Sequence, residues 1–254
     1  MAALITLLAA AASETGLVRQ NNEDAVYSGR CLFAVADGLG GHAAGELASA
    51  AVIGSLSLHD AEADPVALLE ILGQAVAQAN REVARCVSED PARLGMGTTL
   101  TAMLCAGGQA GLVHIGDSRA FRLRAGQLHQ ITEDHVMGKL VSNPGDLAPV
   151  LTRYLDGRPD RSPDLSRREL KPGDRYLLCS DGLSPVVTAG AIRDVLAGAA
   201  DAGEAVRQLV ALAEEAGGPD NISVIVIDVR EGAAGISQPE PVILGAAAAE
   251  VLAR

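Results

Sequence analysis

Four aspartates occupy positions from which their carboxylates could act together. Asp37 and Asp181 each follow an apolar run and each precede a glycine, so each ends a predicted strand. Asp220 lies in a Gly-Pro-Asp-Asn turn directly before another apolar run, and Asp24 precedes a fourth such run. Because the ends of packed strands lie side by side, these side chains can converge on one face. A single Asp-Gly pair is usually only a turn, but the repeated pattern favours a functional site.

Converged carboxylates in a partly dry site raise one another's pKa, so they cannot all stay ionised without compensating charge. A hard divalent cation supplies that charge. The pattern contains acidic residues without His or Cys, and such an all-oxygen set favours Mg²⁺ or Mn²⁺, with waters completing the coordination. Gly38 follows Asp37 directly, and because it has no Cβ its backbone carbonyl can approach an ion.

The apolar runs that carry these aspartates are short and rich in Val, Ile, Leu and Ala, which is typical of buried strands. A hairpin turn is predicted at Gly107-Gly108. Residues 2–8 are predicted as a further strand rather than a signal peptide, because no basic segment precedes them. The other predicted strands cover residues 32–36, 101–105, 111–115, 176–179 and 222–229.

Helical patterns come in two pairs, at 45–59 with 65–87 and at 189–196 with 202–215. Strands and paired helices follow each other in blocks, which predicts an α+β layered domain rather than strict βαβ alternation. We assign this domain to residues 1–230. The helical stripe within 65–87 comprises Val66, Leu69, Leu72, Val76 and Val83.

Two segments fall outside this regular pattern. Residues 143–164, rich in Pro, Asp and Arg, are predicted to form a surface excursion. Residues 231–254, rich in Gly, Ala and Pro, are predicted to form a flexible C-terminal tail.

Bulk composition narrows the class of protein. With 254 residues, one large domain can bury roughly 70–75% of its unfolded surface without disulfides. A formal net charge of −12 disfavours nucleic acid and anionic membranes as partners. No apolar run reaches the roughly 20 residues of a membrane span, so none is expected. The cysteines stand singly in apolar runs, which predicts reduced thiols and a cytoplasmic protein: Cys31, Cys86, Cys105 and Cys179.

Five segments, taken in order, resemble the motif set of the bacterial PPM family, the metal-dependent (type 2C) protein serine/threonine phosphatases. Each motif alone is weakly specific, but five in this order at these spacings are highly specific. The match covers roughly residues 10–230. The segments are GLVRQNNED at 16–24, VADGLGGH at 35–42, GDSR at 116–119, CSDGL at 179–183 and GPDN at 218–221.

The resemblance implies a central antiparallel β-sandwich flanked on both sides by pairs of helices, a four-layer αββα arrangement. It implies two Mn²⁺ or Mg²⁺ ions in a cleft at one end of the sandwich. A water that bridges these ions would hydrolyse phosphoserine and phosphothreonine on protein substrates. The expected partners are phosphoproteins and a cognate serine/threonine kinase, and a monomer is expected.

The resemblance also assigns roles to individual residues. Asp37 would bridge both ions, and the Gly38 carbonyl would bind one of them. Asp181 and Asp220 would bind the other ion. A metal-bound water would be held by Asp24, or by Glu23 beside it.

Two further residues match family positions. Arg19 matches the arginine that binds the substrate phosphate, for which a planar guanidinium that stays charged is well suited. Asp134 matches a position that contributes to a third, weaker ion in bacterial members. The sequence departs from some eukaryotic members at Leu39, where those proteins carry a histidine that is a candidate general acid. His42 is predicted to pack at a helix start.

Three alternatives compete with this interpretation. Residues 38–43 fit the loose GxGxxA pattern of dinucleotide-binding proteins, although Asp37 would repel a pyrophosphate. A non-catalytic member of the same fold would be expected to have lost a metal-binding aspartate, and none is missing. A phosphatase for small phosphomonoesters is compatible with the same residues.

Overall fold

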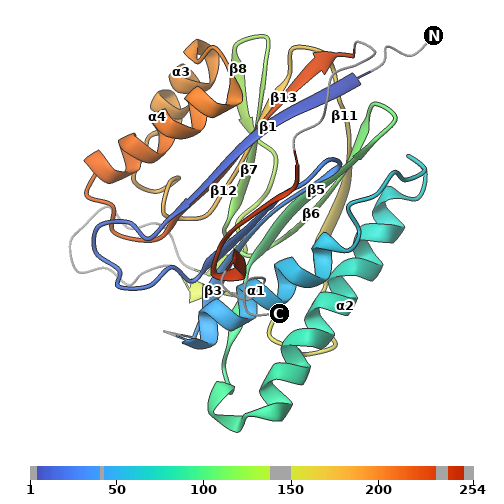
Figure 1. The fold of residues 1–254 in the computed structure, drawn as a ribbon, viewed down its shortest axis with the longest axis vertical. Helices are drawn as coiled ribbons and strands as arrows, with labels where there is room; N and C mark the ends of the chain where they lie inside the picture. Colours follow the sequence, from blue (N-terminus) through green and yellow to red (C-terminus); the bar gives the residue numbers. More distant parts are fainter. Residues whose placement is uncertain (1–4, 41–42, 138–149, 233–239, 249–254) are drawn as a thin grey trace.

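A computed structural model describes residues 5–40, 43–137, 150–232 and 240–248 of the chain. It has a mixed α/β fold whose strands pair antiparallel, as the sequence predicts (Figure 1). His42 and residues 143–149 of the predicted excursion lie outside the described residues. No helix in these described ranges has the length and apolar character that crossing a bilayer requires.

The larger sheet runs in the order β11-β6-β5-β3-β2-β14, and β4 pairs with β3. The predicted hairpin at Gly107-Gly108 is confirmed as the turn between β5 and β6. The strands of this sheet are β2 (Asp24–Ser28), β3 (Leu32–Leu39), β4 (Gly97–Thr98), β5 (Leu100–Ala106), β6 (Gln109–Ile115), β11 (Asp164–Glu169) and β14 (Val242–Gly245).

The smaller sheet runs in the order β1-β13-β12-β7-β8. The predicted N-terminal strand is therefore β1, which pairs with β13 along its whole length. A separate ribbon joins β9 (Val136–Met137) to β10 (Val150–Leu151). The strands of the smaller sheet are β1 (Ile5–Glu14), β7 (Arg119–Arg124), β8 (Gln127–Gln130), β12 (Arg175–Cys179) and β13 (Ile222–Glu231).

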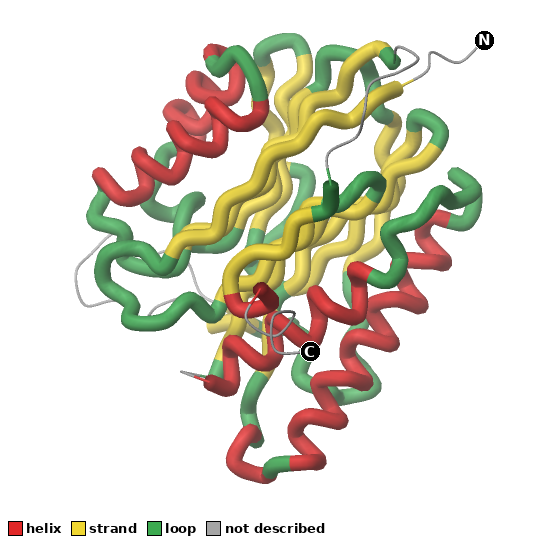
Figure 2. The backbone as a smooth tube through the Cα atoms, viewed as in Figure 1, coloured by secondary structure: helices red, strands yellow, loops and turns green. Residues whose placement is uncertain are grey.

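Within the described ranges, two pairs of α-helices cover these sheets, and a short 3-10 helix, η1 (Pro91–Arg93), follows α2. Figure 2 shows the strands of both sheets lying between the two helical pairs. The helices begin and end close to the predicted positions. They are α1 (Ala43–Ser57), α2 (Leu68–Glu89), α3 (Ala189–Gly198) and α4 (Ala202–Glu215).

Three buried clusters hold the elements together. One packs α1 and α2 against the larger sheet, and a second packs α3 and α4 against the smaller sheet. The third lies between the sheets, where Phe33 and Val35 of one meet Tyr176 and Ile225 of the other. With 2% aromatic residues in the chain, these cores are built mainly from aliphatic side chains. Helix pair, sheet, sheet and helix pair are therefore stacked in that order.

The apolar stripe of α2 is confirmed except at its start. Leu72, Val76 and Val83 are buried in the cluster that joins α2 to the larger sheet. Val66, however, is 74% exposed. The helix begins only at Leu68, so the helical period that would place Val66 on the buried face does not extend back to it.

Part of the predicted C-terminal tail is built into the fold. Residues 242–245 form β14, which pairs with β2 at the edge of the larger sheet. Ala247, just beyond it, is 3% exposed. The Gly-, Ala- and Pro-rich composition of 231–254 suggested a tail, but this segment contains a short run, Val242-Ile243-Leu244, with high strand propensity.

The turn between β2 and β3 is held by one carboxylate. Asp60, which follows α1, accepts hydrogen bonds from the backbone N–H groups of Arg30, Cys31 and Leu32 at 2.9, 2.7 and 2.9 Å. It also accepts one from the Tyr27 hydroxyl at 3.0 Å. Asp60 thus ties α1 to the two strands that carry Asp24 and Asp37 at their far ends.

Replacing this carboxylate should destabilise the protein. Asp60→Ala is expected to lower the free energy of unfolding by about 3 kcal/mol, because several donors lose a charged acceptor at once. The N-cap variant Asp201→Ala, which removes one acceptor from the Glu204 N–H, should cost about 1 kcal/mol. Urea unfolding followed by circular dichroism measures both. If the two variants lost the same free energy of unfolding, Asp60 would stabilise the fold no more than a single N-cap does.

Candidate active site

A cavity of about 220 Å³ opens at one end of the sandwich, where β3 and β12 finish and β13 begins. Six of the residues predicted from sequence line it, namely Arg19, Glu23, Asp37, Gly38, Asp181 and Asp220. The remaining lining residues are Leu39, Gly40, Asp117, Leu151 and Asn221. Segments from both halves of the chain therefore meet in one small polar space.

Asp24 lies directly behind this space. It begins β2, and in the antiparallel register it is the residue opposite Asp37 of β3. Its exposed fraction is 1%, and its Oδ2 atom has no hydrogen-bond partner among the described residues. Like charges directly opposite each other oppose strand pairing, so this register has a cost that a bound cation would remove.

Burial and mutual repulsion hold protons on these carboxyl groups. Burial raises the pKa of Asp24 to about 7, with Asp181 and Asp220 adding to the rise and the hydroxyls of Ser223 and Ser180 opposing it. The pKa of Asp37 is raised well above its usual range, first by burial and then by the charge of Asp24. Without a counter-charge, the pair Asp24–Asp37 therefore resists full ionisation near neutral pH.

The pKa values of two further carboxyl groups at the cavity, Asp181 and Asp117, are also raised. Burial, followed by the charge of Asp220, raises the pKa of Asp181. Burial and then the charge of Asp181 raise the pKa of Asp117 to about 6. All four shifts have the direction expected for acids gathered around a site made for positive charge.

Asp117 is a site residue that the sequence analysis did not single out. It follows β6 in the GDSR motif, which the sequence analysis used only as a likeness. The next residue, Ser118, is fully buried, and its hydroxyl lies 2.7 Å from that of Thr99. Thr99 also binds Asp37 through two hydrogen bonds, so Asp117 and Asp37 are joined by a short polar link. An Asp at the end of an apolar run was the available signal.

Asn221 organises the loop between β1 and β2, and the sequence analysis also missed this role. Its Oδ1 accepts a hydrogen bond from the Glu23 N–H at 2.8 Å. Its Nδ2 donates to the carbonyls of Thr15 and Asn21 at 2.9 and 2.8 Å. With an exposed fraction of 5%, this amide fixes the loop that presents Arg19.

Arg19 lies at the rim of the cavity and pairs with Asp220. Its Nη2 donates to Asp220 Oδ2 at 2.6 Å, and the two side chains are 51% and 31% exposed. The guanidinium therefore stands where a cation would compete for the same carboxylate. A pair this exposed contributes little to stability, so it can be exchanged for other partners.

Close packing demands glycine at position 38. A Cβ there would lie 2.3 Å from the Gly45 carbonyl oxygen and 2.6 Å from that of Glu23. The end of β3 is thus pressed between the start of α1 and the β1–β2 loop. This packing, which the sequence could not reveal, leaves Gly38 on the cavity wall beside Asp37.

Asp134 is not brought to the cavity wall. Its carboxylate accepts hydrogen bonds from Arg119 Nε and Nη2, the shortest at 2.6 Å, and one from Gln130 at 3.0 Å. Arg119 and Asp134 are 16% and 18% exposed. The carboxylate is therefore already neutralised by a guanidinium, which makes it a weaker candidate ligand than the residues that line the cavity.

The donor set fits divalent cations of the hard type. In the described part of the chain, no three His, Cys, Asp or Glu side chains are arranged to enclose one ion. Mg²⁺ and similar ions, however, usually take one or two carboxylates and complete the octahedron with water. The orphaned Asp24 oxygen, the raised carboxyl pKa values and the all-oxygen lining therefore fit such ions better than Zn²⁺.

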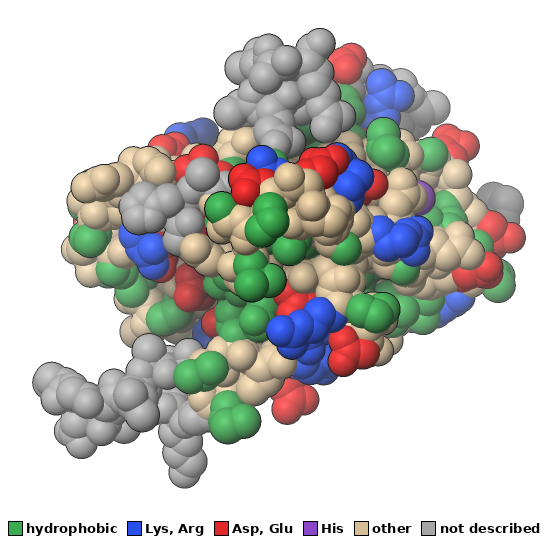
Figure 3. All heavy atoms as spheres, turned by 90° about the horizontal axis from the view of Figure 1, so that it is seen from below, with side chains coloured by type: hydrophobic (Ala, Val, Ile, Leu, Met, Phe, Trp, Pro, Cys, Tyr) green, Lys and Arg blue, Asp and Glu red, His purple; other side chains and the backbone are tan. Residues whose placement is uncertain are grey.

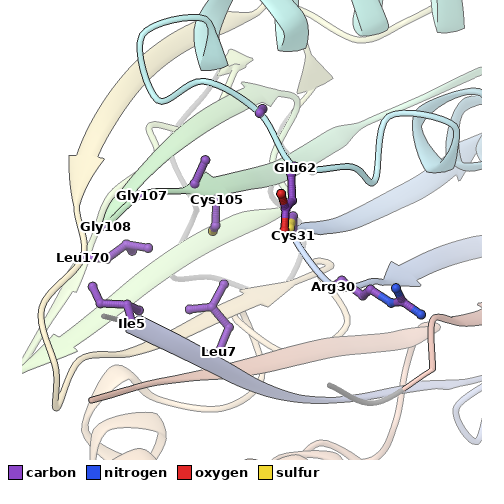
Figure 4. Close-up of a pocket in the computed structure, with 11 residues that line it drawn as sticks. Ile5, Leu7, Arg30, Cys31, Glu62, Cys105, Gly107, Gly108 and Leu170 are labelled. Atoms are coloured by element: carbon purple, nitrogen blue, oxygen red, sulfur yellow. The ribbon is translucent and has the colours of Figure 1, made fainter. Parts of the chain in front are cut away.

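A second cavity, of about 310 Å³, lies at the opposite end of the sandwich. Figure 4 shows Ile5 and Leu7 of β1 on one side of it and the β5–β6 hairpin on the other. Among its described lining residues, only Glu62 is acidic and only Arg30 is basic. Among the described residues, this cavity therefore lacks the cluster of aspartates that lines the 220 Å³ cavity.

One face of the molecule carries charged side chains of both signs (Figure 3). On the face seen from below in Figure 3, Lys and Arg side chains are interspersed with Asp, Glu and exposed hydrophobic side chains. The whole chain carries a formal net charge of −12. Any anionic substrate must therefore be attracted by local positive charge, from Arg19 or from a bound cation.

The antiparallel pairing of β3 with β2 and β5 excludes a dinucleotide-binding fold, which requires parallel strands joined by a crossover helix. The GxGxxA-like pattern at residues 38–43 is therefore not evidence for dinucleotide binding.

Comparisons with known proteins agree with this geometry. The chain is 44% identical over 252 residues to the serine/threonine protein phosphatase PstP of Mycobacterium tuberculosis. The aligned region covers 95% of this chain and 48% of that protein. The chain thus spans about half the length of the mycobacterial relatives that it matches. It is 32% identical to the protein phosphatase PhpP of Streptococcus pneumoniae, covering 86% of this chain and 96% of that protein.

The fold also matches solved structures. The crystal structure of the PstP catalytic domain in complex with two manganese ions superposes with a TM-score of 0.83 and 46% identity, covering 89% of this chain and all of that one. Residues 11–222 match the family model described as protein phosphatase 2C. The chain therefore belongs to the protein phosphatase 2C family.

Proposed function

We propose that this chain is a metal-dependent phosphatase that removes phosphate from phosphoserine and phosphothreonine in proteins. One observation carries the proposal: four aspartates from separate segments line one cavity, and a fifth, Asp24, is buried opposite Asp37. The pKa values of Asp24, Asp37, Asp117 and Asp181 are raised. Relatives that share this fold are named serine/threonine phosphatases, and one is described with two manganese ions.

The proposed ligands belong to two ions, Mn²⁺ or Mg²⁺. Asp37 would bridge the ions, the Gly38 carbonyl would bind one, and Asp181 with Asp220 would bind the other. Asp24, with Glu23 beside it, would hold coordinated water. When bound, the pair of ions neutralises the substrate's charge and acidifies a water for attack on phosphorus.

A third ion is a separate proposal. Asp134 would contribute to it only by giving up contacts with Arg119 and Gln130. Asp117 is better placed, because it lines the cavity and its pKa is raised. We therefore propose Asp117 as the main protein ligand of any third ion, and Asp134 as the less favoured candidate.

The chain's own residues position the substrate. Arg19 stands at the rim, and its fork of N–H donors matches two phosphate oxygens once the pair with Asp220 is exchanged. Asn221 holds the loop that carries Arg19 and so fixes its reach. Leu39 follows Gly38 on the cavity wall and cannot transfer a proton. Positioning and charge neutralisation, rather than a protein nucleophile, supply the catalysis.

The wider setting follows from the same proposal. We propose phosphoproteins as substrates, a cognate serine/threonine kinase as the opposing enzyme, and a monomer as the active form. All four cysteines are free thiols, which supports a reducing compartment and hence a cytoplasmic protein. Small phosphomonoesters remain a second substrate class, since the cavity requires only a phosphate group and a leaving oxygen.

The proposed function is tested on a phosphothreonine peptide. Release of inorganic phosphate should require Mn²⁺ or Mg²⁺, stop with EDTA, and return with either ion but not with Zn²⁺ alone. The same peptide with phosphotyrosine is the control and should react far more slowly. Metal-independent hydrolysis would contradict the proposal, and preference for a free phosphomonoester would favour the second substrate class.

Asp37→Asn separates function from folding. It should reduce turnover of p-nitrophenyl phosphate by a factor on the order of 10³. In EDTA it should raise the melting temperature, because a buried charge that other carboxylates repel has been removed. Asp194→Asn, at a site whose side chain is 69% exposed, is the matched control and should change neither quantity. Full activity of Asp37→Asn would exclude its bridging role.

The raised pKa of Asp24 predicts a pH dependence of the metal-free protein. The folded state keeps a proton between about pH 4 and 7 that the unfolded state has lost, so stability falls as pH rises through that window. Asp24→Asn should therefore match wild type near pH 4 and exceed it by about 2–4 kcal/mol at pH 7.5. Urea unfolding in EDTA at several pH values measures this. A difference that stays constant with pH would show that Asp24 does not titrate in this range.

A further inference from the structure

The strand β14 lies outside the part of the chain that matches the family model, which ends at residue 222. It is the dark red segment across the middle of Figure 1. It pairs antiparallel with β2 from Val242 opposite Ser28 to Gly245 opposite Ala25. β14 thus runs toward the end of β2 where Asp24 lies, and it covers the edge of β2 that β3 does not.

β14 is anchored on both faces of the sheet. Ile243 packs against the cluster that contains α1 and α2, whereas Leu244 packs against the cluster between the two sheets. Successive side chains of a strand point to opposite faces of the sheet, so β14 is covered on both of its faces. Ala247, after the strand, is 3% exposed and belongs to the same cluster as α1. The segment is therefore docked through side chains as well as through backbone pairing.

The end of β14 presses on the residue that begins β2. A Cβ built on Gly245 would lie 2.1 Å from the backbone oxygen of Asp24 and 2.8 Å from the Ser13 hydroxyl. That hydroxyl accepts a hydrogen bond from Asn22 Nδ2, and Asn22 Oδ1 accepts one from the Asp24 N–H. Gly245, with φ of +68°, turns the chain away at this point. The backbone of Asp24 is thus enclosed on this side.

The position of the Asp24 carboxylate depends directly on this backbone. An aspartate side chain is short, so a shift of β2 moves its oxygens by a similar distance, and cation sites tolerate errors of about 0.5 Å. Without β14, β2 would be an edge strand with unpaired N–H and C=O groups along one side. Edge strands that lose their partner open more readily.

We propose that residues 242–248 form a strap that pins β2 and sets the position of Asp24, so that detaching this strap weakens cation binding at the active site. The inference rests on the proposed function, because it assigns Asp24 to the cation site. It makes Gly245 and Leu244 positioning residues although neither lines the cavity.

The test uses the full chain and two matched glycine variants. Gly245→Val places a side chain against the Asp24 carbonyl at a positive φ. Gly126→Val creates the same kind of backbone strain, at φ of +76°, in the β7–β8 turn, where a Cβ would meet nothing within 4 Å. Both should lose stability, but only Gly245→Val should raise the Kd for Mn²⁺, by about tenfold or more, in calorimetry below both melting temperatures.

Hydrogen exchange supplies a readout that does not depend on activity. In metal-free protein, Gly245→Val should speed exchange of the β2 amides at positions 25–28 while leaving α3 and α4 protected as in wild type. If that variant does not fold, Leu244→Ala serves instead, because it weakens the docking without a clash. It should give the same pattern with a smaller rise in Kd.

Three outcomes would overturn the proposal. The proposal would be wrong if variants of the strap bound Mn²⁺ as tightly as wild type. It would also be wrong if hydrogen exchange of the β2 amides in those variants were the same as in wild type. An equal rise in Kd for Gly126→Val would show a general effect of instability. These results are distinct from failure of the proposed function, in which wild type itself would bind no Mn²⁺ and hydrolyse no phosphopeptide, and the strap would then have no site to position.

Discussion

The repulsion between carboxylates at one end of the sandwich is the constraint on which the rest of the structure depends. Asp24 and Asp37 face each other across a strand pair, and Asp181 and Asp220 add their charge from the second sheet. In isolation this arrangement opposes folding, because the charged forms are both buried and close together. The aliphatic clusters on and between the two sheets must therefore hold the strands in register against that repulsion.

The polar groups that position these carboxylates are mostly neutral. Thr98 and Thr99 bind the backbone of Asp37, and the Asn221 amide binds the loop before Asp24. Hydroxyls and amides fix geometry without cancelling charge, so the negative potential of the cavity remains available for a cation. The guanidinium of Arg119 instead neutralises Asp134, which lies off the cavity wall. Among the described carboxylates, Asp24 and Asp37 at the cavity therefore have no arginine partner comparable to the one that Arg119 provides for Asp134.

The C-terminal strand β14, which lies outside the residues that match the family model, also supports the position of these carboxylates. β2 carries Asp24 at its start, and without β14 it would be an edge strand of the larger sheet. β14 covers this edge and contributes Ile243 and Leu244 to two different cores. In the proposed arrangement, a segment that contributes no lining residue to the active-site cavity helps to position that site.

The sequence by itself determined the elements, because periodicity and turn chemistry are local properties. The predicted helical pairs, the hairpin at Gly107-Gly108 and the strands that lead to Asp37 and Asp181 are all present, although β3 continues past Asp37 to Leu39. The ordered motifs were enough to indicate the family. Local patterns also explain the errors. Val66 continued a helical period past the true start of α2, and the short run at 242–244 was hidden within a Gly-, Ala- and Pro-rich segment.

The sequence predicted that the aspartates converge, but only the tertiary structure decided the pairings through which they meet. The register that sets Asp24 opposite Asp37 depends on pairing along the whole of β2 and β3, and a slip of β2 by one residue would turn the Asp24 side chain to the other face of the sheet. Arg19 and Asp220 are 201 residues apart in the chain, and nothing local to either predicts their ion pair. The same holds for Asn221 on the β1–β2 loop, for Arg119 on Asp134 and for β14 on β2. Each of these contacts depends on how distant segments pack, which no local pattern in the sequence encodes.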